Sequence, residues 1–74
     1  MLTRGARLLR RWRDRNKLSQ PEAAALFGLN FMQVSRFERG CGVPGRVNSI
    51  KIESATGGAV PVESWSVAAV RKAG

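Results

Sequence analysis

Few side chains in this sequence could catalyse a reaction or bind a metal. The chain has no histidine, and its single cysteine, Cys41, lies between two glycines with no imidazole to activate it as a nucleophile. A lone cysteine also excludes an internal disulfide and a zinc cluster, and the five carboxylates show no paired spacing. We therefore predict no enzyme activity, no metal, no cofactor and no small-molecule ligand, and we interpret Cys41 as a loop thiol.

Positive charge is the chemistry that the chain carries in excess. Thirteen lysines and arginines face five aspartates and glutamates, for a net charge of +8 over 74 residues. Seven of the basic residues fall in the first 17 positions: Arg4, Arg7, Arg10, Arg11, Arg13, Arg15 and Lys17. Such an excess favours a nucleic acid or an anionic membrane surface as the partner, with a solvated, solubilising helix face as the alternative interpretation.

Size and hydropathy indicate one small globular domain. Apolar residues make up 43% of the chain, a normal share for a globular protein, and 74 residues can build one modest core. No apolar run approaches the roughly 18 residues of a membrane span, and no apolar block typical of a secretion signal follows the basic N-terminus. We therefore expect a single domain over residues 1–74, located in the cytoplasm and without a membrane partner.

The first helix is expected over about residues 4–16. Leu8, Leu9 and Trp12 recur at three- and four-residue spacing, which gives the helix one apolar stripe. A different face repeats a basic residue every four positions, namely Arg7, Arg11 and Arg15. The pattern leaves open whether this basic face meets DNA or acts only through long-range attraction.

Two further helices follow in close succession between residues 19 and 39. Each begins with a capping box, in which two side chains three residues apart accept from each other's backbone N–H, and each ends at a glycine. The two boxes are Ser19 with Glu22 and Asn30 with Gln33, and the two glycines are Gly28 and Gly40.

The connection between these two helices is short. Only three residues separate Phe27 from Phe31, so the helices must cross steeply, as in a helix-turn-helix. Ala24 is small enough to lie where the backbones meet, and we expect Val34 and Phe37 to face inward. Any hairpin of two helices in a small bundle would show the same caps and turn glycine, so these features leave that alternative open.

Residues 18–40 also resemble a known family. The residues LSQ at 18–20, Ala24, Gly28 and the run VSRFERG at 34–40 resemble the helix-turn-helix of Cro-like (XRE-type) phage repressors, with Phe37 in place of the commoner tryptophan. The run IESATGG at 52–58 resembles short Cro- and YdaS-type regulators. The likeness covers about residues 5–58. It implies an all-α, compact, four- to five-helix, lambda-repressor-like DNA-binding domain with its helix-turn-helix over residues 19–39.

The resemblance also implies which residues meet DNA. The base-reading positions are Phe31, Met32, Gln33 and Arg36, and the phosphate-binding candidates are Gln20, Asn30, Arg39, Arg46 and Asn48. Gln33 can bond an adenine edge and Arg36 a guanine edge, while Phe31 and Met32 can contact thymine methyl groups. Two alternatives remain open: Phe31 and Met32 can fold back onto the protein, and Arg36 can meet a phosphate.

A fourth helix is expected after the loop that contains Pro44. It spans about residues 46–56, with Val47 and Ile50 facing inward and Ala55 as a further inward candidate. Ile52 is then an additional apolar residue that broadens the stripe.

The last segment, residues 59–74, is assigned to the core or to a dimer contact. Pro61 can open a fifth helix, or Val60 can pair as a short strand, and Trp65 is open between a core role and a dimer role. The candidate dimer residues are Val60, Val62, Trp65 and Ala69.

The predicted function is a sequence-specific transcriptional regulator that binds double-stranded DNA. We expect a small repressor of its own or a neighbouring operon in a phage or mobile element. One such domain reads only a few base pairs, so a homodimer on a palindromic operator, bound through the major groove, is the expected assembly. Two alternatives are an antitoxin or protein-interaction module with secondary DNA binding, and non-specific nucleic-acid binding through the basic first helix.

Overall fold

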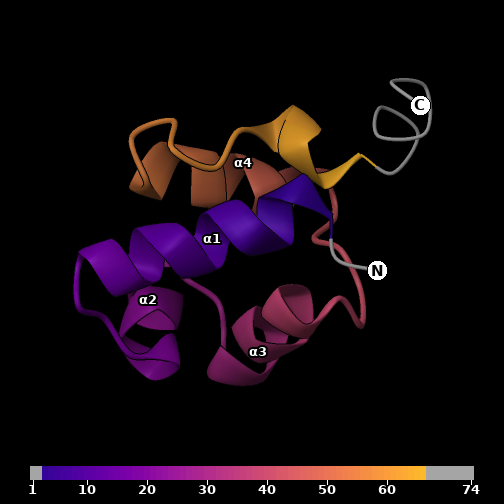
Figure 1. Cartoon of the computed structure of the whole chain (residues 1–74). Coiled ribbons are helices and arrows are strands. Elements are labelled where there is room, and N and C mark those ends of the chain that lie inside the picture. The colour runs from indigo at the N-terminus through magenta and orange to yellow at the C-terminus, as the bar shows by residue number, and fades with distance from the viewer. Residues whose placement is uncertain (1–2, 67–74) are drawn as a thin grey trace.

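Helices make up all the regular structure between residues 3 and 66, which are the residues that the computed structural model describes (Figure 1). In chain order they are α1 Arg4–Arg15, α2 Gln20–Phe27, α3 Phe31–Arg39, α4 Arg46–Ala55 and the 3-10 helix η1 Val62–Trp65. The predicted all-α class is therefore confirmed for this range, and the short strand considered at Val60 is not formed.

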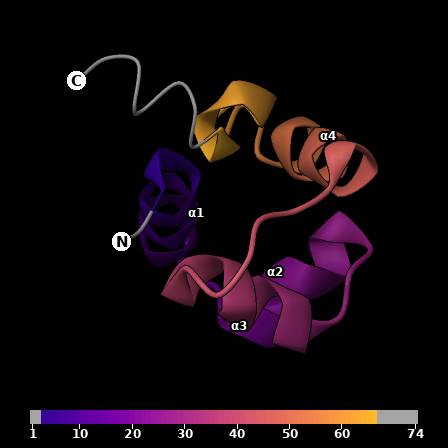
Figure 2. The same ribbon diagram turned by 90° about the vertical axis from the view of Figure 1, so that its right-hand side faces the viewer.

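The helices enclose one core. In Figure 1 α2 and α3 lie on one side of α1, and α4 and η1 lie on the other. Figure 2 shows that α1 occupies one edge of the molecule, and α2 and α4 contact each other beside it. The buried apolar side chains are Ala6, Leu9, Ala23, Ala24, Phe27, Val34, Phe37, Ile52, Val60 and Trp65. Every element supplies at least one of them, so the position of each helix depends on all the others.

Both capping boxes predicted from the sequence are formed. Ser19 Oγ accepts from the Glu22 N–H at 3.2 Å, and Glu22 Oε1 accepts from the Ser19 N–H at 2.8 Å. Asn30 Oδ1 accepts from the Gln33 N–H at 3.0 Å, and Gln33 Oε1 accepts from the Asn30 N–H at 3.2 Å. The caps at the other ends are two glycines with positive φ, Gly28 at 73° and Gly40 at 75°.

The apolar stripe of α1 faces the core as predicted. Leu9 is fully buried, and Leu8 and Trp12 pack partly buried against the same core. One further position proves essential to the packing. A Cβ atom at Gly5 would lie 2.5 Å from Trp65 Cδ2, so only glycine lets the Trp65 ring lie directly on the first turn of α1.

The rotation of α4 about its own axis differs from the prediction. Val47 and Ile50 are 67% and 46% exposed, and Ala55 is exposed as well, so the expectation that these three face inward is wrong. The buried positions are Ile52 and Ser49. The hydroxyl of Ser49 donates to a carbonyl of its own helix, which removes the cost of burying it. Because α4 carries apolar residues on two sides, hydropathy alone did not show which side faces the core.

The segment after α4 completes the core of the single chain. Val60 is fully buried and Trp65 nearly so, with the Trp65 ring edge-on to Phe37 at a centroid distance of 5.8 Å. Neither side chain therefore has a free surface for the dimer contact assigned to it. Val62 is half-buried in η1, which is one short turn rather than a fifth α-helix. Ala69 lies outside the described residues.

Candidate nucleic-acid interface

α2 and α3 pack directly against each other across the turn at residues 28–30. Ala24 is buried, as its small size predicted, and its carbonyl accepts from the Leu29 N–H at 2.9 Å. On the α3 side, Val34 and Phe37 are buried in the same core. With this inner side held by apolar contacts, the opposite side of α3 faces solvent.

An ion pair between Arg13 and Glu38 joins α1 to the inner side of α3. Arg13 Nε donates to Glu38 Oε2 at 2.7 Å, and Arg13 Nη2 donates to Glu38 Oε1 at 2.8 Å. The third guanidinium nitrogen, Nη1, donates to the carbonyl of Leu18 at 3.0 Å. Only 14% of the Arg13 side chain and 5% of the Glu38 side chain is exposed. This two-bond geometry fixes the angle and distance between the helices better than a point-charge contact would.

The pair stabilises the charged form of Arg13. The hydrogen bond to Glu38 raises the pKa of Arg13, an effect that outweighs the opposing effect of partial burial. The sequence predictions missed both residues. A signal was present, because Glu38 follows Val34 by four residues and Arg13 follows Leu9 by four, which puts each charge on the inward stripe of its helix.

The solvent side of α3, here called the α3 outer face, consists of Phe31, Met32, Ser35, Arg36 and Arg39, which line a hollow of about 230 Å³. Phe31 is 50% exposed and Met32 is 63% exposed, so neither is folded into the core. Arg36 is exposed, and its guanidinium group has no hydrogen bond or ion pair with any described residue. Three of the four predicted base-reading side chains thus lie together at one surface.

The fourth of these side chains, Gln33, is held at the start of α3. It is half-buried, and its Oε1 atom is bonded to the backbone of Asn30 in the capping box. The Asn30 side chain is committed to the reverse bond. A two-bond contact from Gln33 to adenine would therefore compete with the cap, and a phosphate contact from Asn30 would do the same.

The remaining phosphate-binding candidates differ in exposure and in whether their side chains are already hydrogen-bonded within the protein. Gln20 is half-buried, and its Nε2 atom donates to Glu38 Oε1 at 3.2 Å, so its amide supports the buried ion pair. Arg39 is exposed, with Nε bonded to the Ser35 carbonyl at 3.3 Å and its two terminal nitrogens free of other described residues. Arg46 is exposed as the first residue of α4. Asn48 is half-buried in the same first turn.

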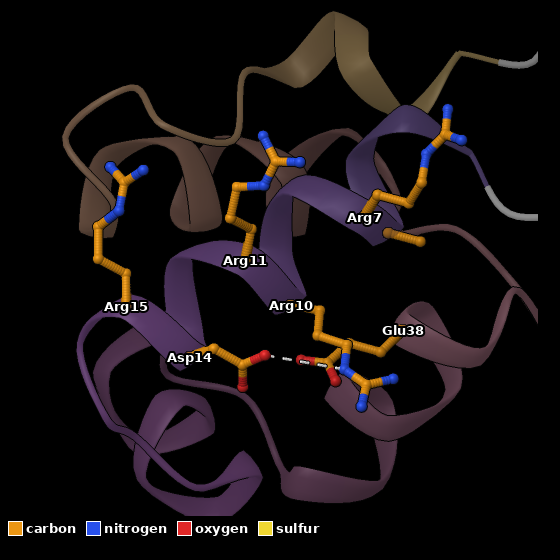
Figure 3. A pocket seen from close by; sticks show the side chains of 7 residues that line it. Arg7, Arg10, Arg11, Asp14, Arg15 and Glu38 are labelled. Atoms are coloured by element: carbon orange, nitrogen blue, oxygen red, sulfur yellow. Dashed lines mark ion pairs between the residues drawn. The ribbon is translucent and has the colours of Figure 1, made fainter.

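α1 carries a second basic surface. Arg7, Arg11 and Arg15, here called the arginine row, project from the side of α1 that is turned away from α3, whereas Arg10 leans toward α3 and Glu38 (Figure 3). The row forms one border of a hollow of about 710 Å³, whose lining is Ala6, Arg7, Arg10, Arg11, Asp14, Arg15 and Glu38. The basic face expected from the four-residue spacing is therefore formed and exposed.

Within residues 3–66, no group of His, Cys, Asp and Glu side chains is arranged to hold a metal ion. Over the same residues, no helix has the length and apolar character needed to cross a bilayer. The chain matches no family model, no curated protein and no solved structure.

Proposed function

We propose that α2 and α3 act as a helix-turn-helix and that the chain is a sequence-specific DNA-binding regulator. The observation that carries the proposal is the α3 outer face. It combines an unpaired guanidinium, two exposed apolar side chains and a hydroxyl on a helix whose inner side is held by the core and by the Arg13–Glu38 pair. An α-helix fits the major groove of B-DNA, where base edges offer both hydrogen-bonding groups and thymine methyls.

In this proposal Arg36 is the principal reading residue. A guanidinium can donate two bonds to O6 and N7 of guanine, and a good contact of this kind contributes about 1–3 kcal/mol of discrimination. Met32 and Phe31 are apolar, exposed and adjacent, which suits contact with thymine methyls. Gln33 has the secondary role, because its amide oxygen already serves the cap.

Phosphate contacts would hold the helix in register without reading sequence. Arg39 lies on the α3 outer face, and Arg46 begins α4 at a helix N-terminus that no side chain caps. Basic side chains and free N–H groups at such positions attract phosphate oxygens. If about six phosphates are neutralised, the logarithm of the binding constant should fall with the logarithm of salt concentration with a slope of about −5.

A homodimer on a palindromic site belongs to the proposal, because one α3 helix reads few base pairs. With Val60 and Trp65 buried in the core, we assign the two-fold contact to Leu26, Val47 and Ile50, which are large, apolar and exposed. Leu26 and Ile50 border the same hollow between α2 and α4. Copies with a charge of +8 repel each other, so an association of this chain has to rest on apolar contacts.

With these properties the chain would act as a small repressor that blocks a promoter by occupying it, as Cro-like regulators of phages and mobile elements do. The test is selection of bound duplexes from a random pool by the wild-type chain, by Arg36→Ala and by Arg11→Ala. We expect the wild type to enrich a palindrome, Arg36→Ala to lose preference within each half-site, and Arg11→Ala to keep it. An unenriched wild-type pool would contradict the proposal.

A further inference from the structure

The arginines of α1 differ from one another in what they contact. In the part of the chain that the structure describes, ion pairs involve only Arg10 and Arg13, with Asp14 and Glu38 as the carboxylate partners. The guanidinium groups of Arg7, Arg11 and Arg15 are exposed and have no hydrogen bond or ion pair with a described residue. The proposed DNA contact through α3 leaves these three guanidinium groups unused.

The spacing of the arginine row fits a phosphate backbone. Residues four apart on an α-helix are separated by about 6 Å along its axis, so Arg7 and Arg15 stand about 12 Å apart. A strand of B-DNA presents one phosphate per roughly 3.4 Å of helix axis, so three long, flexible side chains over that length can each reach a different phosphate. No acidic side chain lies within the row itself; the nearest carboxylate, Asp14, is drawn toward Arg10 and Arg13.

The orientation of the row separates it from the α3 outer face. In Figure 3 the three side chains of the row extend from α1 away from α3, although the row and Glu38 border the same hollow. A duplex that contacts the row therefore approaches α1 from another direction than the one in which α3 lies.

We propose that the arginine row binds the backbone of a second DNA duplex, so that one protein bridges two DNA segments. The first duplex is the one held by α3, and in this respect the inference rests on the proposed function. Contact through guanidinium and phosphate alone is independent of sequence. A repressor bound at its operator would in this way hold a distant or neighbouring stretch of DNA.

Two other anionic partners fit the row less well. A helix that lies on a membrane buries large apolar side chains beside its basic ones. Among residues 3–66, the exposed large apolar residues are all outside α1, namely Leu26, Phe31, Met32, Val43, Val47 and Ile50. Single-stranded nucleic acid is held by stacking on exposed aromatic rings. The single aromatic ring of α1, Trp12, is half-buried and lies against Phe27 at a centroid distance of 5.6 Å.

The experiment measures capture of a second duplex. A duplex that carries the selected site is fixed to beads and loaded with protein, and a labelled duplex of unrelated sequence is then added. The variants are R7Q/R11Q/R15Q for the arginine row and Arg36→Ala for α3. Thermal unfolding of each variant checks that it folds. Vesicles of phosphatidylserine and phosphatidylcholine and a labelled single strand serve as competing ligands.

We expect the triple variant to bind the bead-bound duplex as the wild type does and to retain at least about tenfold less of the second duplex. The salt slope of second-duplex capture should fall by about 3, one for each lost phosphate contact. Equal loss at both duplexes would overturn the proposal, because the row would then lie along the first duplex. Unchanged capture would overturn it as well, and so would row-dependent binding of vesicles or single strands in preference to duplex.

Failure of the proposed function would look different. If Arg36→Ala left binding of the selected duplex unchanged while the triple variant still lost second-duplex capture, the role of α3 would be wrong and the role of the arginine row would stand. If the triple variant kept full capture while Arg36→Ala lost the selected site, the role of the arginine row would be wrong and the role of α3 would stand.

Discussion

The α3 outer face and the arginine row are both basic, yet their chemical composition differs. The α3 outer face mixes apolar, hydroxyl and guanidinium groups around one hollow. The arginine row presents guanidinium groups alone at regular spacing. A duplex groove offers varied base edges, whereas its backbone repeats one anionic group. Net charge by itself therefore does not distinguish a surface that reads bases from one that binds the backbone. The side chains next to each charge make that distinction.

A third kind of arginine connects the two surfaces. Arg13 belongs to the same helix as the arginine row, but its guanidinium group is paired with the buried Glu38 carboxylate. This pair ties α1 to α3, so it sets the position of one basic surface relative to the other.

Removing one partner of the buried pair should have the largest effect. Glu38→Ala leaves the Arg13 guanidinium largely buried without its carboxylate, and we expect a loss of about 3–5 kcal/mol in the free energy of unfolding, measured with urea. Asp14→Ala is the matched control, because the exposed Asp14 carboxylate makes only long ion pairs, at 3.9 Å with Arg10 and 4.0 Å with Arg13, and their loss should cost under about 1 kcal/mol.

Because Glu38→Ala can unfold so small a domain outright, a second variant keeps this prediction testable. Replacing both partners, as Arg13→Met with Glu38→Leu, removes the unpaired charge and should restore most of the stability. An unfolding free energy of Glu38→Ala within about 1 kcal/mol of the wild type would show that the pair does not hold α3 to α1.

Removing one arginine from each surface should have the next largest effect. Arg36→Ala should weaken binding to the selected site by about 5- to 150-fold, which corresponds to about 1–3 kcal/mol, and much less on unrelated duplex. Arg11→Ala removes the same charge from the arginine row and should leave this preference intact. Fluorescence anisotropy with both duplexes measures the two ratios, and equal effects of the two variants would erase the distinction between the surfaces.

The smallest expected effect concerns the two capping boxes. Hydrogen bonds from the Ser19 backbone and hydroxyl lower the pKa of Glu22 below its ordinary value, whereas the matching residue of the α3 box, Gln33, does not titrate. A pKa lowered by folding contributes stability above the unfolded-state value, and this contribution is lost as pH falls through the folded-state value.

Glu22→Gln should therefore be less stable than the wild type near pH 7, and the difference should shrink under acid conditions, below about pH 4. Urea midpoints for the two proteins at neutral and acid pH measure it. A stability difference that grows as the pH falls would contradict the assignment of the lowered pKa of Glu22 to the cap.

Local signals in the sequence predicted more of this fold than long-range ones. The capping boxes and the glycine ends of α2 and α3 depend on residues within a few positions of one another, and they are confirmed. The rotation of α4 and the burial of Val60 depend on which distant surfaces meet. The contact of Trp65 with Gly5 joins the two ends of the described chain, and no local sequence pattern predicts it.

The candidate site follows the same division. Exposure of Met32 and Arg36 follows from the helical spacing of Val34 and Phe37, so this part of the α3 outer face could be predicted. Exposure of Phe31 could not, because it lies three residues before the buried Val34. The turning of the Gln20 amide onto Glu38 could not, because it depends on an ion pair between two helices. Polar residues near a predicted interface can serve the fold rather than the partner, and only the three-dimensional contacts separate the two.

The most direct test of the central claim is an NMR titration of the isotope-labelled chain with the selected duplex, which maps the DNA contact residue by residue. We expect the largest changes at the amide and side-chain signals of Phe31, Met32 and Arg36. Changes confined to α1, with the α3 outer face unmoved, would contradict that claim.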